Sequence, residues 1–352
     1  MTAETHGDRQ LAVRLGELLG PRHPVAAAAV VTPEGTHVAS RGTDADADAD
    51  FDFEIGSVSK AVTGLLYADA LTRGEITTDT RLGELLPLGD APVARVTLRA
   101  LSTHRSGLPR LPKSAQPWRR TITLWRNGTN PYGETLAQLL LQTRDVPLGT
   151  PRSRYSNLGY ELLGHALARA ATTTYSELVQ QRIATPLELD CFYVPVTADE
   201  LRPTALHGRS RRGRPRQPWT GEGLGPAGGI RASITSMARF TAAILDGSAP
   251  GTAALDPVAP VGGGARIGAA WITVQVKGRP ITWHNGGTGG FRSWLGLDRN
   301  TGTGAVLLSA TAASVDRQGF ALLAEHSLST GNSDSNSNSN SNSNSNSNSN
   351  RR

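Results

Sequence analysis

The sequence predicts an α/β (α+β) fold, in which an antiparallel sheet built from both ends of the chain is flanked by helices and interrupted by a mainly helical region. Three patterns in the 352 residues predict it. A strand, a turn and a second strand occupy residues 25–41, helical periodicity dominates residues 75–250, and alternating apolar and polar residues return after Pro260. Because sheets and helices must each bury an apolar face, these segments are expected to pack as layers.

The N-terminal segment contains a helical stripe followed by a hairpin pattern. Apolar residues recur at helical spacing over residues 11–19, which favours a short helix. Residues 25–31 and 36–41 are typical of strands, and Pro33 and Gly35 supply the turn between them. The alternating Asp and Ala residues that follow, over 44–50, predict an exposed loop.

The central region shows mostly helical patterns. A helix predicted over residues 57–73 ends at Gly74, since glycine tolerates the backbone conformation that closes many helices. Thr174 and Glu177 form a capping box that begins a further helix. The other helices are predicted over residues 97–101, 133–142, 158–171 and 233–245.

After Pro260 the periodicity changes from helical to alternating. An antiparallel meander is predicted, followed by a closing helix near residues 315–328. Its strands are expected over residues 271–277, 281–285, 291–297 and 305–310. Residues 1–330 are therefore expected to form the folded domain, with the helical insertion at about 75–250. The Ser/Asn repeat of residues 331–352 has no apolar side chains to bury and is expected to be disordered.

Arginine carries almost all of the positive charge. The net charge is +6, and only Lys60, Lys113 and Lys277 are lysines. One arginine-rich stretch contains the helix breakers Gly213 and Pro215 and no recognition motif, so a solvated loop is expected there and no nucleic-acid interface. Its arginines are Arg209, Arg211, Arg212, Arg214 and Arg216.

The sequence contains few signals for the cellular location or the oligomeric state of the protein. The single cysteine excludes an internal disulfide and a cysteine-based metal cluster. Residues 1–24 lack the apolar run of a signal peptide, and the apolar run at 25–31 is too short to span a bilayer. No membrane segment is expected, and a cytoplasmic location is the default prediction. The sequence carries no signal for the oligomeric state.

Ser57 and Lys60 form the first part of a candidate catalytic site. They stand three residues apart at the start of an apolar helix, so their side chains share one helical face. In a chain this rich in arginine a lysine is the exception, and unlike arginine it can release its proton. The pair is therefore a candidate nucleophile and base for acyl transfer.

Tyr155 and Asn157 form a second element, on a turn that enters a helix. A tyrosine close to a lysine can act as a phenolate, because the ammonium charge lowers a phenol's pKa, and it can then remove the proton of a serine hydroxyl. The amide of Asn157 can hold both the lysine and a substrate carbonyl. The alternative interpretation is that Tyr155 is an aromatic residue stacked on the core.

A glycine-rich segment at a strand end supplies the third element. Gly286, Gly287, Gly289 and Gly290 would let a substrate lie against the strand backbone, where an N–H group can complete an oxyanion hole. His284 would place a positive or hydrogen-bonding group beside it. The alternative interpretation is a glycine-rich hairpin turn with a surface histidine.

Taken together and in this chain order, the three elements resemble those of the serine β-lactamase and penicillin-binding-protein superfamily. The resemblance is strongest to the branch of class C β-lactamases, DD-peptidases and related esterases, and it spans about residues 10–328. Residues 101–109 are similar to the His-Thr-Ser-Gly-Leu segment of that branch, and residues 227–230 are similar to its glycine turn before a helix.

The resemblance implies a β-lactamase/DD-peptidase-like fold and a role for each catalytic candidate. Ser57 would be the acylated nucleophile, and Lys60 and Tyr155 would share the general-base and general-acid work. Asn157 would bind and orient the substrate together with the strand-end residues His284, Asn285, Gly286 and Gly287. The main-chain N–H groups of Ser57 and Gly287 would then form the oxyanion hole.

The same resemblance also marks a departure. His284, Asn285 and Gly286 stand where many relatives carry Lys-Thr-Gly, so this chain lacks both the lysine and the threonine hydroxyl. The loss argues against a tight grip on a β-lactam carboxylate. Histidine at this position also occurs in DD-peptidase and esterase relatives, so the departure concerns the substrate and leaves the chemistry unchanged.

The predicted function is a serine hydrolase that forms an acyl-enzyme on Ser57 and uses no metal or cofactor. Its expected partner is a small-molecule acyl substrate, namely a β-lactam, a D-alanyl amide or a small ester, and the lack of an export signal favours an intracellular esterase or amidase. A non-catalytic or slowly deacylating ligand-binding member of the same fold is the alternative. No Gly-x-Ser-x-Gly elbow or His-Glu-x-x-His motif supports other hydrolase mechanisms.

Overall fold

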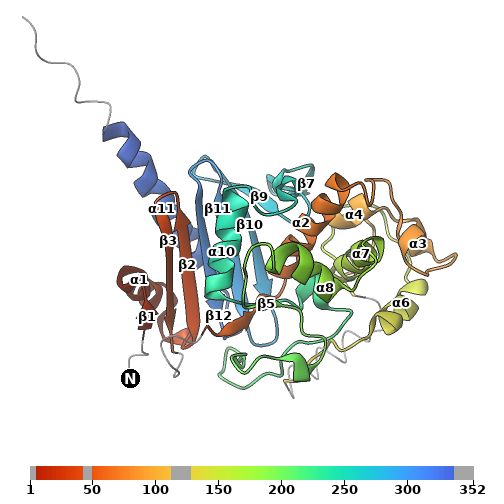
Figure 1. Cartoon of the computed structure of the whole chain (residues 1–352), viewed down its shortest axis with the longest axis horizontal. Coiled ribbons are helices and arrows are strands. Elements are labelled where there is room, and N and C mark those ends of the chain that lie inside the picture. Colours follow the sequence, from red (N-terminus) through yellow and green to blue (C-terminus); the bar gives the residue numbers. More distant parts are fainter. Residues whose placement is uncertain (1–4, 43–49, 112–127, 337–352) are drawn as a thin grey trace, which may run out of the picture.

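A nine-stranded antiparallel sheet forms one half of the molecule, and helices of the central region form the other half (Figure 1). The computed structural model describes residues 5–42, 50–111 and 128–336. The strand order is β1-β3-β2-β12-β11-β10-β9-β8-β7, so both ends of the chain build the sheet, as predicted. The strands are β1 (Thr5–Gly7), β2 (Ala26–Thr32), β3 (Gly35–Arg41), β7 (Ala259–Gly262), β8 (Ala265–Ile267), β9 (Ile272–Val276), β10 (Arg279–Gly287), β11 (Arg292–Asp298) and β12 (Thr303–Ser309).

Helices cover both faces of this sheet. On one face α2 (Val58–Thr72) contacts β10 and β11, and α10 (Ile234–Leu245) packs on β12 and β2. On the other face lie α1 (Arg9–Leu19), which packs on β3, and α11 (Asp316–Asn336), which packs on β11 and β12. Each face has its own apolar core, so the sheet separates two layers.

The alternation of side chains along β10 assigns its residues to one layer or the other. His284 pairs with Leu295, which belongs to the core on the α2 side. Asn285 pairs with Trp294, which belongs to the core beneath α11. Because successive residues of a strand point to opposite faces, His284 and Asn285 face different layers.

The helical half is centred on α7 (Asn157–Ala170), which packs against α2 and against α9 (Gly225–Gly228). The predicted capping box is present: the Thr174 N–H donates to Glu177 Oε2 (3.0 Å), and the Glu177 N–H donates to Thr174 Oγ1 (3.2 Å). The other helices of this half are α3 (Leu82–Leu85), α4 (Leu98–Ser102), α6 (Leu136–Arg144), α8 (Tyr175–Val179) and α9 (Gly225–Gly228). Single helical turns lie at Gly20–Arg22, Pro92–Arg95, Gln180–Ala184, Ala198–Glu200 and Thr252–Leu255.

A second, three-stranded sheet was not predicted from the sequence. It consists of β4 (Asp52–Glu54), β6 (Arg231–Ser233) and β5 (Phe192–Tyr193), in the order β4-β6-β5. Strands of two or three residues are too short to show an alternating pattern, which explains why they were missed. The small sheet joins three segments that are distant in the sequence, and its strand β4 ends shortly before Ser57.

The predicted Ser/Asn tail and the predicted Asp/Ala loop lie largely outside the residues that the structure describes. Helix α11 continues to Asn336, past the predicted start of the Ser/Asn tail, and residues 337–352 lie outside the described part of the chain. Residues 44–49 of the Asp/Ala loop predicted over 44–50 also lie outside it. Among the helices that the structure describes, none is long and apolar enough to cross a membrane.

Candidate active site

Ser57 lies on a sharp turn between the small sheet and helix α2. Gly56, just before it, has a φ of +52°, which favours glycine. A Cβ atom at Gly56 would lie 2.5 Å from the Gly287 nitrogen, so the turn passes directly against the end of β10. Ser57 is the N-cap residue of α2, but its side chain makes no capping hydrogen bond. Its hydroxyl is therefore free to interact across the site.

Two proton-bearing groups converge on the Ser57 hydroxyl oxygen. Lys60 Nζ donates to Ser57 Oγ at 3.1 Å, and Tyr155 Oη donates to it at 2.6 Å. Lys60 is fully buried, whereas Tyr155 is 37% exposed, so the tyrosine lies at the open side of the site. The structure thus brings the three predicted catalytic residues together, and Tyr155 is not a core aromatic.

Lys60 is held by neutral oxygen atoms. Besides Ser57, its ammonium group donates to the main-chain carbonyl of Ala227 in α9, and it lies 4.9 Å from the centre of the Tyr155 ring. No acidic side chain of the described residues forms an ion pair with it. The glycine turn at residues 227–230 thus supplies a lysine acceptor, a role that sequence reasoning had not assigned.

His104 supports Tyr155 from the buried side. The two rings lie 4.7 Å apart, and His104 Nδ1 accepts a hydrogen bond from the Ser156 N–H (3.3 Å). Burial, reinforced by the Lys60 charge, lowers the pKa of His104 well below its usual range. The imidazole is therefore neutral. The segment of residues 101–109 was noted in the sequence, but this support for the tyrosine was not foreseen.

Asn157 reaches the site but makes a different contact from the one expected. Its Nδ2 donates to Tyr132 Oη at 3.2 Å, and no hydrogen bond to Lys60 is formed. Its Oδ1 is buried and has no hydrogen-bond partner among the described residues. A buried carbonyl oxygen without a hydrogen bond lowers the stability of the folded protein, and a ligand that donates to it would remove this cost. Asn157 therefore offers an acceptor to a ligand.

His284 is on the site side of β10, yet it is neither charged nor at the surface. The side chain is 2% exposed, and Nδ1 donates to the main-chain carbonyl of Asn285 at 2.7 Å. Burial, followed by the Lys60 charge, lowers the pKa of His284 to about 4. Of the positive or hydrogen-bonding group expected here, the structure has the hydrogen-bonding one, a buried neutral imidazole whose Nε2 can accept a hydrogen bond. The alternative of a surface histidine is wrong.

Asn285 is not part of the cluster around Ser57. Its side chain points to the opposite layer, where Nδ2 donates to Asp316 Oδ2 at 3.0 Å at the start of α11. Asn285 was expected among the substrate-orienting residues because His284, Asn285 and Gly286 stand where many relatives carry Lys-Thr-Gly. The alternation of the strand separates the two neighbours.

The glycines of the strand end have two different uses. A Cβ atom at Gly286 would lie 1.9 Å from the Ile55 carbonyl oxygen, and one at Gly290 would lie 2.6 Å from Gly208. These two glycines therefore permit close packing of the chain on itself. The sequence had instead predicted that they make room for a substrate. The Gly287 nitrogen, in contrast, lies beside Gly56.

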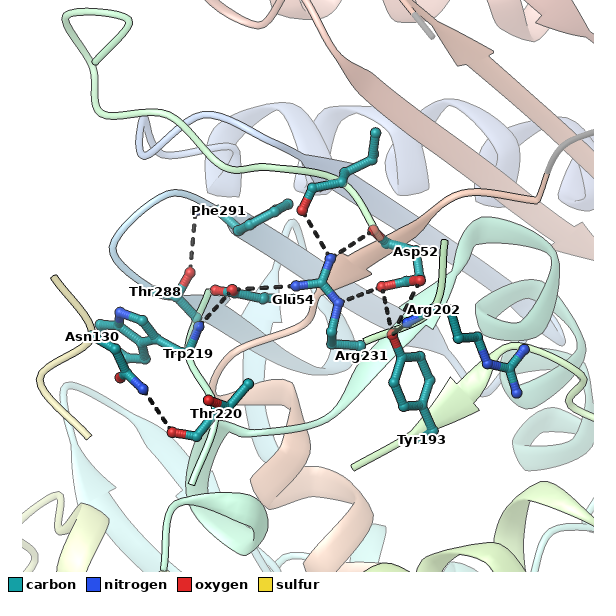
Figure 2. A network of polar contacts seen from close by, with 11 residues as sticks. Asp52, Glu54, Asn130, Tyr193, Arg202, Trp219, Thr220, Arg231, Thr288 and Phe291 are labelled. Atoms are coloured by element: carbon teal, nitrogen blue, oxygen red, sulfur yellow. Dashed lines mark hydrogen bonds and ion pairs between the residues drawn. The ribbon is translucent and has the colours of Figure 1, made fainter. Parts of the chain in front are cut away.

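A buried ionic network supports the segment before Ser57 (Figure 2). The Arg231 guanidinium is shared between the carboxylates of Asp52 and Glu54, and it also lies 5.4 Å from the Phe291 ring. Burial raises the pKa of Glu54, against the opposing effect of Arg231. Glu54 Oε1 accepts the Trp219 N–H at 2.8 Å. The network joins β4, β6 and the β10–β11 turn, and so fixes the frame around the serine.

The cluster as a whole combines a serine hydroxyl, a lysine, an exposed phenol and two neutral imidazoles. It can therefore carry out nucleophilic attack with proton transfer at one oxygen atom. Within the described ranges, no group of three or more His, Cys, Asp or Glu side chains could hold a metal ion.

Comparisons with known proteins define the class. The family model described as Beta-lactamase matches residues 14–327, and the chain belongs to this family. Among solved structures, a D-alanine carboxypeptidase AmpC from Burkholderia cenocepacia matches with a TM-score of 0.74 at 21% identity, covering 91% of this chain and 99% of the other. A class C β-lactamase from Rhodobacter sphaeroides matches with a TM-score of 0.72 at 19% identity, covering 92% and 99%. The predicted fold and superfamily are confirmed.

Curated relatives point to the same class. The chain is 27% identical over 277 residues to penicillin-binding protein 4 of Amycolatopsis lactamdurans, covering 74% of this chain and 66% of the relative. It is 26% identical over 283 residues to the D-alanyl-D-alanine-carboxypeptidase/endopeptidase AmpH of Escherichia coli (strain K12), covering 72% and 69%. The match thus spans about two thirds of each relative's length. These relatives and the family support the hydrolase class expected from the sequence.

Proposed function

We propose that the chain is a serine hydrolase that works through an acyl-enzyme on Ser57. One observation carries the proposal: Lys60 Nζ and Tyr155 Oη both lie within hydrogen-bond distance of Ser57 Oγ, at 3.1 Å and 2.6 Å. A nucleophile with a proton acceptor at this distance is the arrangement that covalent hydrolysis needs.

Each residue has a defined part in the proposed reaction. Tyr155, held beside the Lys60 ammonium group, takes the Ser57 proton as Oγ attacks the substrate carbonyl, and then passes that proton to the leaving group. In the second half Tyr155 activates the water that releases the acyl group. Asn157 Oδ1 accepts an N–H of the substrate where the substrate has one.

The proposed oxyanion hole consists of the main-chain N–H groups of Ser57 and Gly287. The Ser57 N–H donates to no described residue, and it belongs to the N-terminal end of α2, where the helix dipole favours negative charge. The Gly287 nitrogen lies against Gly56, next to the serine. Donors held in place at this position would stabilise the tetrahedral intermediate.

The proposed substrates are a β-lactam, a D-alanyl amide or a small ester. The relatives named penicillin-binding protein 4 and D-alanyl-D-alanine-carboxypeptidase/endopeptidase support the first two. The neutral His284 supplies a hydrogen bond but no charge at neutral pH, so this position alone does not hold a substrate carboxylate.

Covalent labelling tests the proposal. The protein and its Ser57→Ala variant are incubated with a fluorophosphonate and, separately, with a penicillin, and the intact mass and labelled peptide are measured. We expect an adduct on Ser57 that the variant lacks; no adduct with either reagent would contradict the proposal. Hydrolysis of nitrocefin and of p-nitrophenyl esters then ranks the substrates. A stable adduct without turnover of any substrate would favour the slowly deacylating alternative.

A further inference from the structure

His104 has an unusual backbone conformation next to the site. Its φ of +56° lies in the left-handed region, which few residues other than glycine adopt and in which histidine and asparagine are among the exceptions. The residue follows α4, is 6% exposed, and donates its N–H to the Leu101 carbonyl at 3.0 Å. A buried residue kept in such a conformation beside a candidate site points to a role for its side chain.

His104 holds the main chain on both sides of Tyr155. Its carbonyl oxygen accepts the Arg154 N–H at 2.9 Å, and its ring nitrogen Nδ1 accepts the Ser156 N–H at 3.3 Å. One residue thus bonds to both sequence neighbours of the tyrosine. The stretch of backbone that carries the Tyr155 side chain is therefore fixed from a single point of the fold.

The imidazole of His104 also adjoins two phenol rings. Its centre lies 4.7 Å from that of Tyr155 and 4.8 Å from that of Tyr160. Tyr160 is fully buried in α7 and donates through Oη to the Ser102 carbonyl, so it gives the imidazole a rigid support. Tyr155, in contrast, is 37% exposed. Its ring is therefore supported mainly from the side on which His104 lies.

The hydrogen bond to Ser156 defines what this position needs. Nδ1 accepts a hydrogen bond only in the neutral ring that carries its proton on Nε2. Asparagine would place its Oδ1 acceptor as many bonds from the backbone as Nδ1, and it also tolerates the left-handed conformation. Leucine and phenylalanine have no acceptor. The three residues can therefore separate the hydrogen bond from the ring contact.

We propose that His104 is a positioning residue for Tyr155, because its carbonyl oxygen and Nδ1 hold the tyrosine backbone where Tyr155 Oη reaches Ser57 Oγ. That contact is 2.6 Å long. A displacement of about 1 Å between reacting groups can cost about 10²-fold in rate. This inference rests on the proposed function, because it concerns the group that takes the proton of the same serine.

Three substitutions test which part of His104 matters. Hydrolysis of p-nitrophenyl butyrate and the rate of fluorophosphonate labelling of Ser57 are measured in each. In His104→Leu and His104→Phe we expect kcat to fall on the order of 10–100-fold with KM within about twofold, whereas His104→Asn should stay within about fivefold of wild type. His104→Asn as slow as the other two, or wild-type rates in His104→Phe, would overturn the inference.

A double-mutant cycle tests whether His104 acts through Tyr155. In a Tyr155→Phe background the proton acceptor is already lost, so adding His104→Leu should lower the labelling rate of Ser57 by less than about threefold. With Tyr155 present, the same substitution should lower it on the order of 10–100-fold. Equal losses in the two backgrounds would mean that the effect does not pass through the tyrosine, which contradicts the inference.

His165→Leu is the matched control. His165 is also buried and also bonded to the main chain, since its Nε2 donates to the Glu222 carbonyl at 3.1 Å, but its ring adjoins Tyr175 at 6.2 Å. The substitution should lower stability and leave kcat and the labelling rate within about twofold of wild type. A loss of rate equal to that of His104→Leu would reduce the effect at His104 to a general one and would contradict the inference.

Hydrogen exchange tests the inference separately from activity. NMR compares exchange of the Ser156 amide in the wild-type protein, in His104→Asn and in His104→Phe. We expect exchange on the order of tenfold faster in His104→Phe and close to wild type in His104→Asn. Unchanged exchange in His104→Phe would contradict the inference even if no substrate is hydrolysed. Labelling of Ser57 in the wild-type protein would then still support the proposed function.

Discussion

Two polar clusters lie on either side of the same short stretch of chain, and they are built in opposite ways. At its beginning, Asp52 and Glu54 share the buried guanidinium of Arg231, so charges of opposite sign are paired (Figure 2). At its end, the ammonium of Lys60 is held by neutral oxygens, and Tyr155 is 37% exposed.

The difference separates a structural cluster from a reactive one. A buried charge that is fully paired stabilises one arrangement, and removing its partner leaves an uncompensated charge. A group that must give and take a proton cannot be locked in an ion pair, and it needs access to substrate. Substitutions in the first cluster should therefore lower stability, whereas those in the second should lower activity. The following predictions test this contrast from the largest expected effect to the smallest.

Loss of the nucleophile or of its lysine should have the largest effect. We expect Ser57→Ala to abolish hydrolysis and Lys60→Arg nearly to do so, with kcat/KM falling on the order of 10⁴-fold or more, because arginine keeps its charge but cannot release a proton. Initial rates with p-nitrophenyl esters measure this. Lys60→Arg with near wild-type rates would refute a proton-transfer role for Lys60.

Tyr155→Phe should reduce kcat/KM by about 10²–10⁴-fold, since it removes the proton acceptor next to Ser57. Tyr132→Phe is a suitable control, because the hydrogen bond that Tyr132 makes to the site within the described part of the chain is the one with Asn157. Burial also raises the pKa of Tyr132 and keeps it protonated. The control should lose about tenfold or less. Equal losses in the two variants would remove the special role of Tyr155.

Arg231→Leu should act on stability instead. It leaves Asp52 and Glu54 buried without their partner, and we expect the free energy of unfolding to fall by about 3–5 kcal/mol in urea titration. Arg239→Leu removes an arginine that is 51% exposed and 3.6 Å from Asp190. This control should cost about 1 kcal/mol or less. Similar losses from both substitutions would argue against the structural role of the network.

Stability should also decrease in acid because of buried neutral histidines. Burial lowers the pKa of both His165 and His284 to about 4, below the usual value near 6.5. As the pH falls below 6.5 the unfolded chain takes up these protons first, so the free energy of unfolding should fall by about 2 kcal/mol for each histidine by pH 4.5. Urea titrations at pH 7, 5.5 and 4.5 measure the loss. His284→Gln should flatten the curve, and a wild-type protein equally stable at all three pH values would contradict the assignment.

Asn285→Ala should have the smallest effect on catalysis. It removes a hydrogen bond to Asp316 on the far side of the sheet, so we expect a cost of about 1 kcal/mol in stability and less than about threefold in kcat/KM. Asn157→Ala, which removes an unpartnered acceptor in the site, should reduce kcat/KM for amide substrates more strongly. Equal reductions would place Asn285 back among the substrate-orienting residues.

Much of the fold could be predicted because its longer elements carry local patterns. The hairpin of β2 and β3, the capping box at Thr174 and Glu177, and the four-strand meander follow from periodicity and turn residues within a few positions of one another. The small sheet of β4, β6 and β5 could not be predicted, because its strands are short and their partners are distant in sequence.

The sequence by itself determined that Ser57 and Lys60 share a helical face, since that depends only on a spacing of three residues. It also predicted that His284 and Asn285 are neighbours in one strand, although it assigned both of them to the site. Only the tertiary structure decided which of the two faces Ser57, and it brought Tyr155 to the serine from 98 residues away. Contacts of that range depend on how the layers pack, because the pattern of one strand does not say which neighbour will cover each face.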